Sequence, residues 1–292
     1  MSIKGHQKII TALDFAVEKK SISHAYLFCG PEGVGKFLTA MYFCGKLTEE
    51  KDGKLNRNLS IIEPEIEEKD GIFKEKEIKI EKIKNIEKEF SLTSFEKGYR
   101  VAIIRSAQKM NIAAQNALLK TLEEPPLKSV IVLVAENENS LLPTVVSRCQ
   151  IIRFSLLSDK EIAEIFIAEK DREALIFWSL GRPGFAQKFL TESDALQKRK
   201  EILEEFKSLF SMNLNDKFFF AEKASKDIFE LSQKMDLWIV VLRKTVLGEK
   251  ALIDIFPDKA LDLIEKIAST KKILNTTNAN ARLAIENLLV FF

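Results

Sequence analysis

Hydrophobic positions along the first half of the chain follow two different spacings. Short runs rich in β-branched or aromatic residues predict buried strands at 25–29, 59–62, 99–104, 129–135 and 150–154. Between these runs, apolar residues recur three or four positions apart and predict helices at 36–47 and in NIAAQNALLKTLEE, where Pro125 and Pro126 end the helix. Strands that alternate with helices predict an α/β fold, with a parallel sheet covered on both faces.

The pattern changes after Phe154, because no further strand of comparable quality follows. The remaining sequence is typical of amphipathic helices, and Gly181, Pro183 and Gly184 mark one break between them. This change predicts three domains: an α/β domain at 1–155, a small helical domain at 156–196 and a helical C-terminal domain at 197–292.

The segment 63–89 is dense in Glu and Lys, so we interpret most of it as a solvated charged face. Two features within it indicate regular structure. Ile78 and Ile80 alternate as in a strand, and Ile83 and Ile86 then follow at helical spacing.

Composition narrows the class of protein without identifying it. Hydrophobic residues make up 46% and charged residues 30%, which is the balance of a soluble globular protein, and no apolar run approaches the roughly 20 residues that a bilayer span needs. The opening MSIKGHQKII lacks the features of a secretory signal, so we expect a cytoplasmic protein with no membrane partner. Basic and acidic residues nearly balance, 45 against 43, so net charge neither demands nor excludes nucleic acid.

The cysteines Cys29, Cys44 and Cys149 are far apart and lack C-x-x-C spacing. This spacing excludes a disulfide framework and a four-cysteine zinc site, so we expect reduced thiols. No metal site is predicted.

The stretch GPEGVGKF follows a predicted strand and opens a predicted helix, as a phosphate-binding loop does. Such a loop presents backbone N–H groups and the positive end of a helix to phosphate, and here the candidate nucleotide-binding residues are Gly30, Gly33, Gly35 and Lys36. The next position normally supplies a hydroxyl to magnesium, but Phe37 occupies it. We therefore predict weakened magnesium coordination, with a residual capacity to hold a nucleotide or phosphate loosely.

A second element of an ATPase is also missing. The strand VAII should end in acidic residues that bind magnesium, yet Arg105 and Ser106 follow it. Because two departures affect the same ion, we predict that the chain does not hydrolyse ATP. The sequence leaves two roles open for Arg105: it replaces part of the magnesium charge near Lys36, or it forms an ordinary salt bridge or faces solvent.

Several segments in order resemble one family, the delta-prime subunits of the bacterial DNA polymerase III clamp loader, which are AAA+ proteins related to the gamma/tau subunits. The segments that carry the resemblance are HAYLFCGPEGVGK, LSIIEPE, IKIEKIKNIEKEFSLTSFEKGYRVAII, NALLKTLEEPP, LLPTVVSRCQIIRF and GRPGFA. They span residues 1 to about 190, and the helical remainder fits by length and type only. The resemblance implies an AAA+ P-loop domain, a small helical lid and a helical collar.

The resemblance implies a role for Arg148, with Ser147 and Cys149 in its motif. In clamp loaders this Ser-Arg-Cys motif provides an arginine finger that reaches the ATP of a neighbouring subunit. Such an arginine is worth about 10³ to 10⁵ in rate, or roughly 4 to 7 kcal/mol. From composition alone, Arg148 would be a solvated surface cation.

Departures from the family pattern bear on the cofactors. TEEKDGKLNRN lacks the cysteines of the zinc module that many relatives carry, so we predict no zinc and no required cofactor.

The residues that sense the nucleotide in active relatives are not clear in this sequence. The segment AENEN presents no clear sensor residue, and Gly184 stands where active relatives have a sensor arginine, with Arg182 close by.

The resemblance implies partners as well. A delta-prime subunit sits in a pentameric ring with delta and gamma/tau subunits, and through that complex it meets the sliding clamp and primer-template DNA. We expect ring contacts from 202–292, where the apolar stretch WIVVLRKTVLG belongs to a core or a subunit seam. Lys109 and Lys120 are either DNA-phosphate contacts or ordinary surface lysines.

Two alternative functions remain at this point. An active gamma/tau-like ATPase would hydrolyse ATP with magnesium, against which Phe37 and Arg105 argue. An adaptor with the AAA+ shape would leave Arg148 without a catalytic role.

Overall fold

The computed structural model describes residues 5–48, 58–69, 72–91, 98–169, 172–248, 252–276 and 279–292. The chain divides into two compact units, Met1–Gln187 and Lys188–Phe292. Each unit is described by itself. The three-domain division at 155 and 196 stays a prediction.

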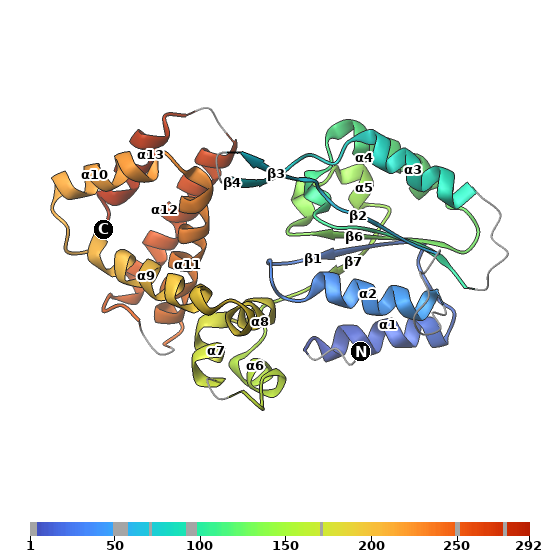
Figure 1. The fold of residues 1–292 in the computed structure, drawn as a ribbon, viewed down its shortest axis with the longest axis horizontal. Helices are drawn as coiled ribbons and strands as arrows, with labels where there is room; N and C mark the ends of the chain where they lie inside the picture. Colours follow the sequence, from blue (N-terminus) through green and yellow to red (C-terminus); the bar gives the residue numbers. More distant parts are fainter. Residues whose placement is uncertain are drawn as a thin grey trace. The chain divides into compact units, whose positions relative to one another are not determined.

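The first unit is built on a five-stranded sheet in the order β2-β5-β6-β1-β7 (Figure 1). All the paired strands in it run parallel; for example, Leu27 lies opposite Leu133 on one side and Ile151 on the other. The α/β prediction is therefore confirmed. The strands are β1 (Ala25–Cys29), β2 (Leu59–Ile62), β5 (Arg100–Ile104), β6 (Ser129–Ala135) and β7 (Gln150–Arg153).

Helices cover both faces of this sheet (Figure 1). Side chains alternate between the faces, so that Leu27 enters one core and Tyr26 and Phe28 enter the other. The second of these cores includes α1 (Gln7–Glu18) and α2 (Lys36–Leu47). The first is closed by α3 (Ile80–Ser91), α4 (Ile112–Glu123) and α5 (Pro143–Val146).

Local sequence sets the bounds of α4, which carries the NALLKTLEE segment. The Asn111 side chain accepts a hydrogen bond from the Ala114 N–H at 2.9 Å and so caps the helix start. The helix ends at Glu123, just before the two prolines.

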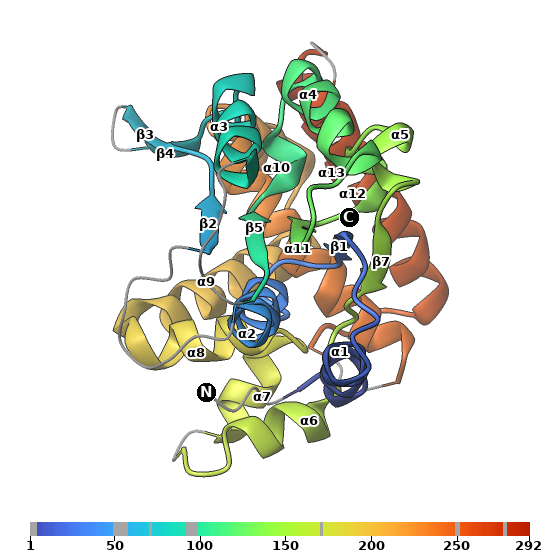
Figure 2. The ribbon, with the colours of Figure 1, turned by 90° about the vertical axis from the view of Figure 1, so that its right-hand side faces the viewer.

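The charged segment 63–89 differs in part from the prediction. The structure contains an antiparallel hairpin of β3 (Ile66–Lys69) and β4 (Ile72–Glu75), which projects beyond β2 (Figure 2). The strand expected from Ile78 and Ile80 is wrong, because Ile78 forms only an isolated bridge to Met110 and Ile80 begins α3. The predicted helical spacing is confirmed by α3, where Ile83 and Ile86 are buried.

The first unit ends with α6 (Asp159–Ile165), α7 (Arg172–Ser179) and α8 (Pro183–Thr191), the last of which runs past the boundary. Ser158 and Glu161 form a capping box that starts α6. The predicted break is present, since Leu180 and Gly181 have φ of 54° and 76° between α7 and α8.

The second unit is entirely helical within the described residues. Trp238 stacks on Phe206 with ring centroids 5.0 Å apart, and Phe292 packs against both rings. In WIVVLRKTVLG, Trp238, Val241 and Leu242 are buried, whereas Leu247 is 71% exposed, so the prediction of a core or a seam is met by the core for only part of the stretch. The helices are α9 (Ser193–Leu209), α10 (Leu214–Ala224), α11 (Ile228–Val246), α12 (Pro257–Thr276) and α13 (Ala281–Leu289).

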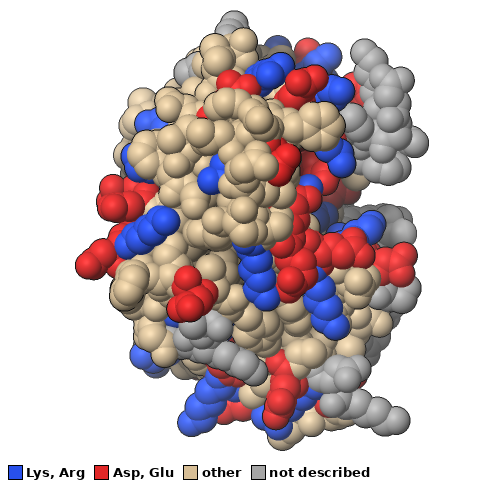
Figure 3. Space-filling view, turned by 90° about the vertical axis from the view of Figure 1, so that its left-hand side faces the viewer, with Lys and Arg blue, Asp and Glu red and all other residues tan. Residues whose placement is uncertain are grey.

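The helical unit also exposes many large apolar side chains. Figure 3 looks onto this unit and shows a broad area of uncharged side chains, with charged ones mostly at its margins. The exposed apolar residues include Leu214, Phe219, Phe229, Leu247, Phe256 and Leu283.

Among the described residues, no helix combines the length and apolar character that a membrane crossing requires. In the same part of the chain, no three His, Cys, Asp or Glu side chains gather as metal ligands would. The segment TEEKDGKLNRN, on which the zinc prediction rests, lies mostly outside the described residues.

Candidate functional site

The carboxyl ends of the parallel strands bring the candidate nucleotide residues together. Gly30 follows β1, Arg105 follows β5, Glu136 follows β6 and Phe154 follows β7. In open α/β sheets, ligands bind at this edge of the sheet. The predicted nucleotide loop therefore lies where the fold places such sites.

The loop backbone depends on its glycines. Gly30, Gly33 and Gly35 have φ of 147°, 77° and 100°, conformations that residues with a Cβ rarely adopt. At Gly30, an added Cβ would lie 2.1 Å from the Phe154 carbonyl oxygen, so the loop packs directly on the end of β7. The Gly30 N–H also donates to the Glu136 carbonyl at 3.2 Å, which fixes the start of the loop to β6.

The loop keeps free hydrogen-bond donors. Within the described residues, the backbone N–H groups of Gly33, Val34 and Gly35 have no hydrogen-bond partner. Together with the N-terminus of α2, these groups form a cradle that suits an anion.

Lys36 points into the loop. Its ammonium donates to the Gly30 carbonyl at 2.5 Å and to the Pro31 carbonyl at 2.7 Å, and the residue is only 8% exposed. Burial lowers the pKa of Lys36 below its usual range, although Glu136 and Glu32 oppose this shift. To reach a bound phosphate, the ammonium must leave the carbonyls that it now holds.

Other elements of the same unit close on the loop. The Gly184 N–H at the start of α8 donates to the Gly33 carbonyl at 2.8 Å, and the Arg182 guanidinium lies over the Phe185 ring nearby. The His6 imidazole Nε2 lies 3.0 Å from the Val34 carbonyl, and burial lowers the pKa of His6. These contacts hold the loop in one conformation.

The two departures from an ATPase site touch each other. The Arg105 guanidinium lies 5.1 Å from the centroid of the Phe37 ring, within the range of a cation–π contact. Arg105 also pairs with Glu63 at 3.2 Å, so of the two roles left open for Arg105 the structure contains the salt bridge. A guanidinium and an aromatic ring thus lie together beside the first turn of α2.

Few carboxylates are available to replace the missing magnesium ligands. Glu136 follows β6, and its side chain accepts a hydrogen bond from the Gln108 amide at 3.2 Å. Glu138 is paired with Arg153 at 2.7 Å. Glu136 and Glu32 lie near the loop, but the position after β5, where the magnesium-binding acid is expected, is occupied by Arg105.

Arg148 lies away from the loop, on the segment between α5 and β7. Its Nη1 donates to the Thr144 carbonyl at 2.8 Å, and its Nη2 donates to Glu123 Oε1 at 2.6 Å. The Arg148 side chain is 35% exposed and the Glu123 side chain 51%. The guanidinium is therefore both restrained and accessible.

The neighbours of Arg148 in its motif have structural contacts. The Ser147 hydroxyl donates to the Thr144 carbonyl at 3.1 Å. Cys149 packs against the core, and burial raises the pKa of its thiol to about 12. Both residues hold the backbone that carries Arg148.

Gln115 is a residue that the sequence analysis missed. Its amide donates to the Met110 carbonyl at 3.0 Å and accepts from the Leu142 N–H at 2.7 Å. The residue is 6% exposed, and it connects α4 to the start of the segment that bears Arg148. The sequence signal that could have identified Gln115 is a polar residue among the apolar positions of a predicted amphipathic helix.

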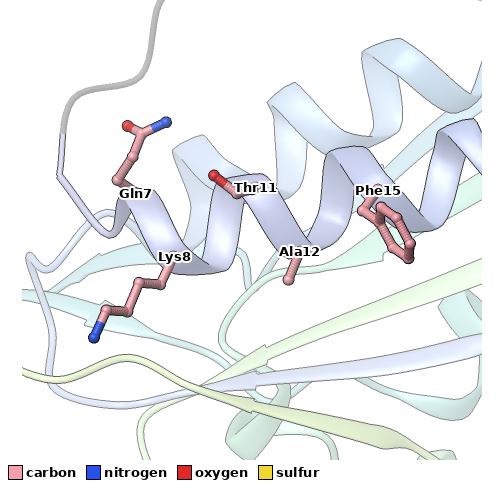
Figure 4. Close-up of a pocket in the computed structure, with 5 residues that line it drawn as sticks. All are labelled: Gln7, Lys8, Thr11, Ala12 and Phe15. Carbon is pink, nitrogen blue, oxygen red and sulfur yellow. The ribbon is translucent and has the colours of Figure 1, made fainter.

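Two other features give weaker evidence of function. Lys109 lies 3.8 Å from Glu75, and Lys120 is exposed on α4, so both alternatives for these two lysines, DNA contacts or ordinary surface residues, stay open. A shallow hollow of about 470 Å³ follows one side of α1, as Figure 4 shows. It is lined by Gln7, Lys8, Thr11, Ala12 and Phe15, which come from this one helix.

One family model and several relatives match about half of this chain. The family described as DNA polymerase III, delta subunit, matches residues 5–158. The chain is 34% identical over 172 residues to DNA polymerase III subunit delta′ of Bacillus subtilis, which is 56% of this chain and 51% of that protein. It is 30% identical over 174 residues to subunit tau of the same organism, which is 55% of this chain and 30% of that protein.

Other relatives extend over more of the chain. The replication factor C small subunit of Methanococcus maripaludis is 27% identical over 290 residues, 90% of this chain and 83% of that protein. A DNA polymerase III gamma subunit-related protein of Thermotoga maritima has the same fold, with a TM-score of 0.50 at 20% identity, covering 95% of this chain and 97% of that one. The matched part of the delta′ relative is about half of its length.

Proposed function

The chain belongs to the DNA polymerase III delta subunit family, and from this premise we propose that it is a non-hydrolysing, delta-prime-like subunit of a replicative clamp loader. In this role it supplies Arg148 in trans to the nucleotide of a neighbouring ATPase subunit. The complex then loads a sliding clamp onto primed DNA.

The observation that carries the proposal is the contact between Arg105 and Phe37. In a working site of this type, a hydroxyl and a carboxylate hold magnesium at these two positions. Here Phe37 and Arg105 occupy these two positions, so both ligands are absent from them, and the Arg105 guanidinium lies over the Phe37 ring. Coulomb repulsion between the guanidinium and magnesium disfavours the metal further. The loop can still hold a nucleotide or phosphate weakly, without hydrolysing it.

Arg148 is suited to act on another chain. It is accessible, it is anchored at two terminal nitrogens, and within the described residues its only carboxylate partner is Glu123. An arginine that stabilises charge on a transferring phosphoryl group accelerates hydrolysis by about 10³ to 10⁵. Because the chain's own loop lacks magnesium ligands, the proposed target is a neighbour's triphosphate.

The helical unit supplies the proposed contacts with the other subunits. Support comes from its large exposed side chains, such as Phe219 at 73% and Phe256 at 83%, and from the broad uncharged area of this unit in Figure 3, because an extended apolar surface marks an interaction site. Delta and gamma/tau subunits in a pentameric ring are the partners that we propose for it. Contact with DNA phosphates through Lys109 or Lys120 would be salt-dependent.

The experiment that tests this function is a reconstitution with a gamma/tau-type ATPase subunit. The rate of ATP hydrolysis in the presence of primed DNA is compared between the wild-type chain and Arg148→Ala. We expect Arg148→Ala to lower kcat by about 10³-fold or more. An unchanged kcat would favour the adaptor alternative, in which Arg148 has no catalytic role.

A further inference from the structure

We infer that Glu123 is a positioning residue, which fixes the Arg148 guanidinium before it meets the neighbour's nucleotide. This inference rests on the proposed function and adds a residue to it. Glu123 touches no substrate; it acts through Arg148.

The carboxylate of Glu123 is presented from a rigid support. Glu123 is the last residue of α4, and the preceding Leu122 is 2% exposed in the core. Pro125 follows closely and restricts the backbone beyond the helix. The position of the carboxylate is therefore set by the packed helix and not by a loop.

Two elements hold the guanidinium from different directions. Glu123 Oε1 accepts from Nη2 at 2.6 Å, while the Thr144 carbonyl of α5 accepts from Nη1 at 2.8 Å. The Ser147 hydroxyl lies 3.5 Å from the same Nη1. Because a charge-assisted bond at this distance is among the stronger hydrogen bonds, the carboxylate is the main restraint.

These contacts are compatible with simultaneous binding of an anion. A guanidinium has five N–H donors. Within the described residues, the Nε–H group and one N–H of Nη2 have no acceptor. The arginine can thus donate to an incoming phosphate oxygen without first giving up Glu123, which distinguishes positioning from an inhibitory contact.

The expected benefit is a smaller loss of conformational freedom. A free arginine side chain samples many rotamers, and ordering it in the transition state slows the reaction. Glu123 and Thr144 impose this order in advance. Loss of Glu123 should therefore lower kcat, while the affinity of the ATPase subunit for ATP stays the same.

The test uses the reconstituted complex of this chain with its gamma/tau-type ATPase subunit and primed DNA. We compare Glu123→Ala, Glu123→Gln and the matched control Glu124→Ala. Glu124 is the adjacent exposed carboxylate, and it forms no ion pair with the described residues. We expect Glu123→Ala to lower kcat about tenfold at unchanged KM for ATP, Glu123→Gln to lower it about threefold, and Glu124→Ala to stay within about twofold.

A double variant separates positioning from a general structural effect. In the absence of the arginine, Glu123 has nothing to position, so Arg148→Ala with Glu123→Ala should be no slower than Arg148→Ala alone. Glu123→Gln preserves volume, so it serves if the alanine variant does not assemble.

The outcomes distinguish the inference from the proposed function. In one outcome, Arg148→Ala lowers kcat, but both Glu123 variants behave as Glu124→Ala or raise kcat. The positioning role of Glu123 is then wrong, while the catalytic role of Arg148 is retained. In the other outcome, Arg148→Ala leaves kcat unchanged, and both the proposed function and the positioning role are then wrong.

Discussion

The guanidinium of Arg105 lies over the ring of Phe37, 5.1 Å from its centroid. The two residues come from different elements, since Phe37 is in the first turn of α2 and Arg105 follows β5. In an ATPase of this type both positions serve the magnesium ion. Their mutual contact means that the two departures form one local arrangement, which a single substitution does not reverse.

Restoring the metal ligands should require changes at both positions. Phe37→Thr adds the hydroxyl but leaves the Arg105 charge near the ion, and Arg105→Asp adds a carboxylate but leaves the ring. We expect magnesium to tighten nucleotide binding by about tenfold or more only in the double variant, since a carboxylate and a hydroxyl then act together. Calorimetric titration with magnesium or with EDTA measures this, and tight magnesium-dependent binding by Phe37→Thr alone would contradict it.

Gln115 should matter for both stability and the Arg148 segment. Gln115→Ala leaves the Met110 carbonyl and the Leu142 N–H without their partner, at about 1–3 kcal/mol for the buried Met110 carbonyl and less for the partly buried Leu142 N–H. We expect a decrease of about 2–4 kcal/mol in the free energy of unfolding of the α/β unit. Urea denaturation followed by circular dichroism measures it. Asn116→Ala, at an exposed position of the same helix, is the control and should change little.

Acid should reduce the contribution of His6 to the free energy of unfolding, because His6 is partly buried beside the nucleotide loop. Burial is the largest cause that lowers the pKa of His6 below its ordinary value of 6.5, with Val34 and Glu161 opposing it. The unfolded chain therefore takes up this proton first as pH falls. The His6 contribution is retained above pH 6.5 and decreases through the window between that value and the lower folded pKa.

The variant His6→Asn removes this titration and tolerates the left-handed backbone at φ 52°. We expect its unfolding midpoint to depend less on pH below 6.5 than that of the wild type, in denaturation curves at matched pH values. If the unfolding midpoints of the two proteins change equally with pH, His6 is not the group that causes the loss of stability in acid.

The exposed apolar side chains of the helical unit should contribute to assembly and not to folding. Phe219 is 73% exposed on α10, so Phe219→Glu loses little packing within the chain. We expect association with the partner subunits to weaken by at least about tenfold, as for an aromatic anchor at an interface. Sedimentation velocity measures the association. Lys223→Glu on the same helix is the control, because it changes the charge without removing apolar surface.

The sheet could be predicted from the sequence because its central strands are buried on both faces and therefore form continuous apolar runs, such as SVIVLVA. The hairpin β3–β4 could not, since its strands have four residues each and are rich in Glu and Lys. The strand predicted at Ile78 and Ile80 was wrong for a related reason, because an alternation over so few residues also fits the start of a helix.

The nucleotide loop was predicted from its spacing, because the three glycines and Lys36 lie within seven neighbouring residues, 30–36. The contacts that decide its chemistry are between distant residues, and spacing carries no information about them. Arg105 with Phe37, Arg148 with Glu123, and Gln115 with Leu142 each join separate elements. The motif could suggest that Arg148 is important, but only the folded chain places Glu123 beside it.

The central claim is that this chain's own loop does not hydrolyse ATP and that its chemical contribution is made in trans. The most direct measurement is ATP hydrolysis by the purified chain alone, with magnesium, beside a Lys36→Ala variant that removes the loop ammonium. The account predicts no hydrolysis above the level of the Lys36→Ala variant. Magnesium-dependent turnover by the wild-type chain that disappears in Lys36→Ala would contradict it.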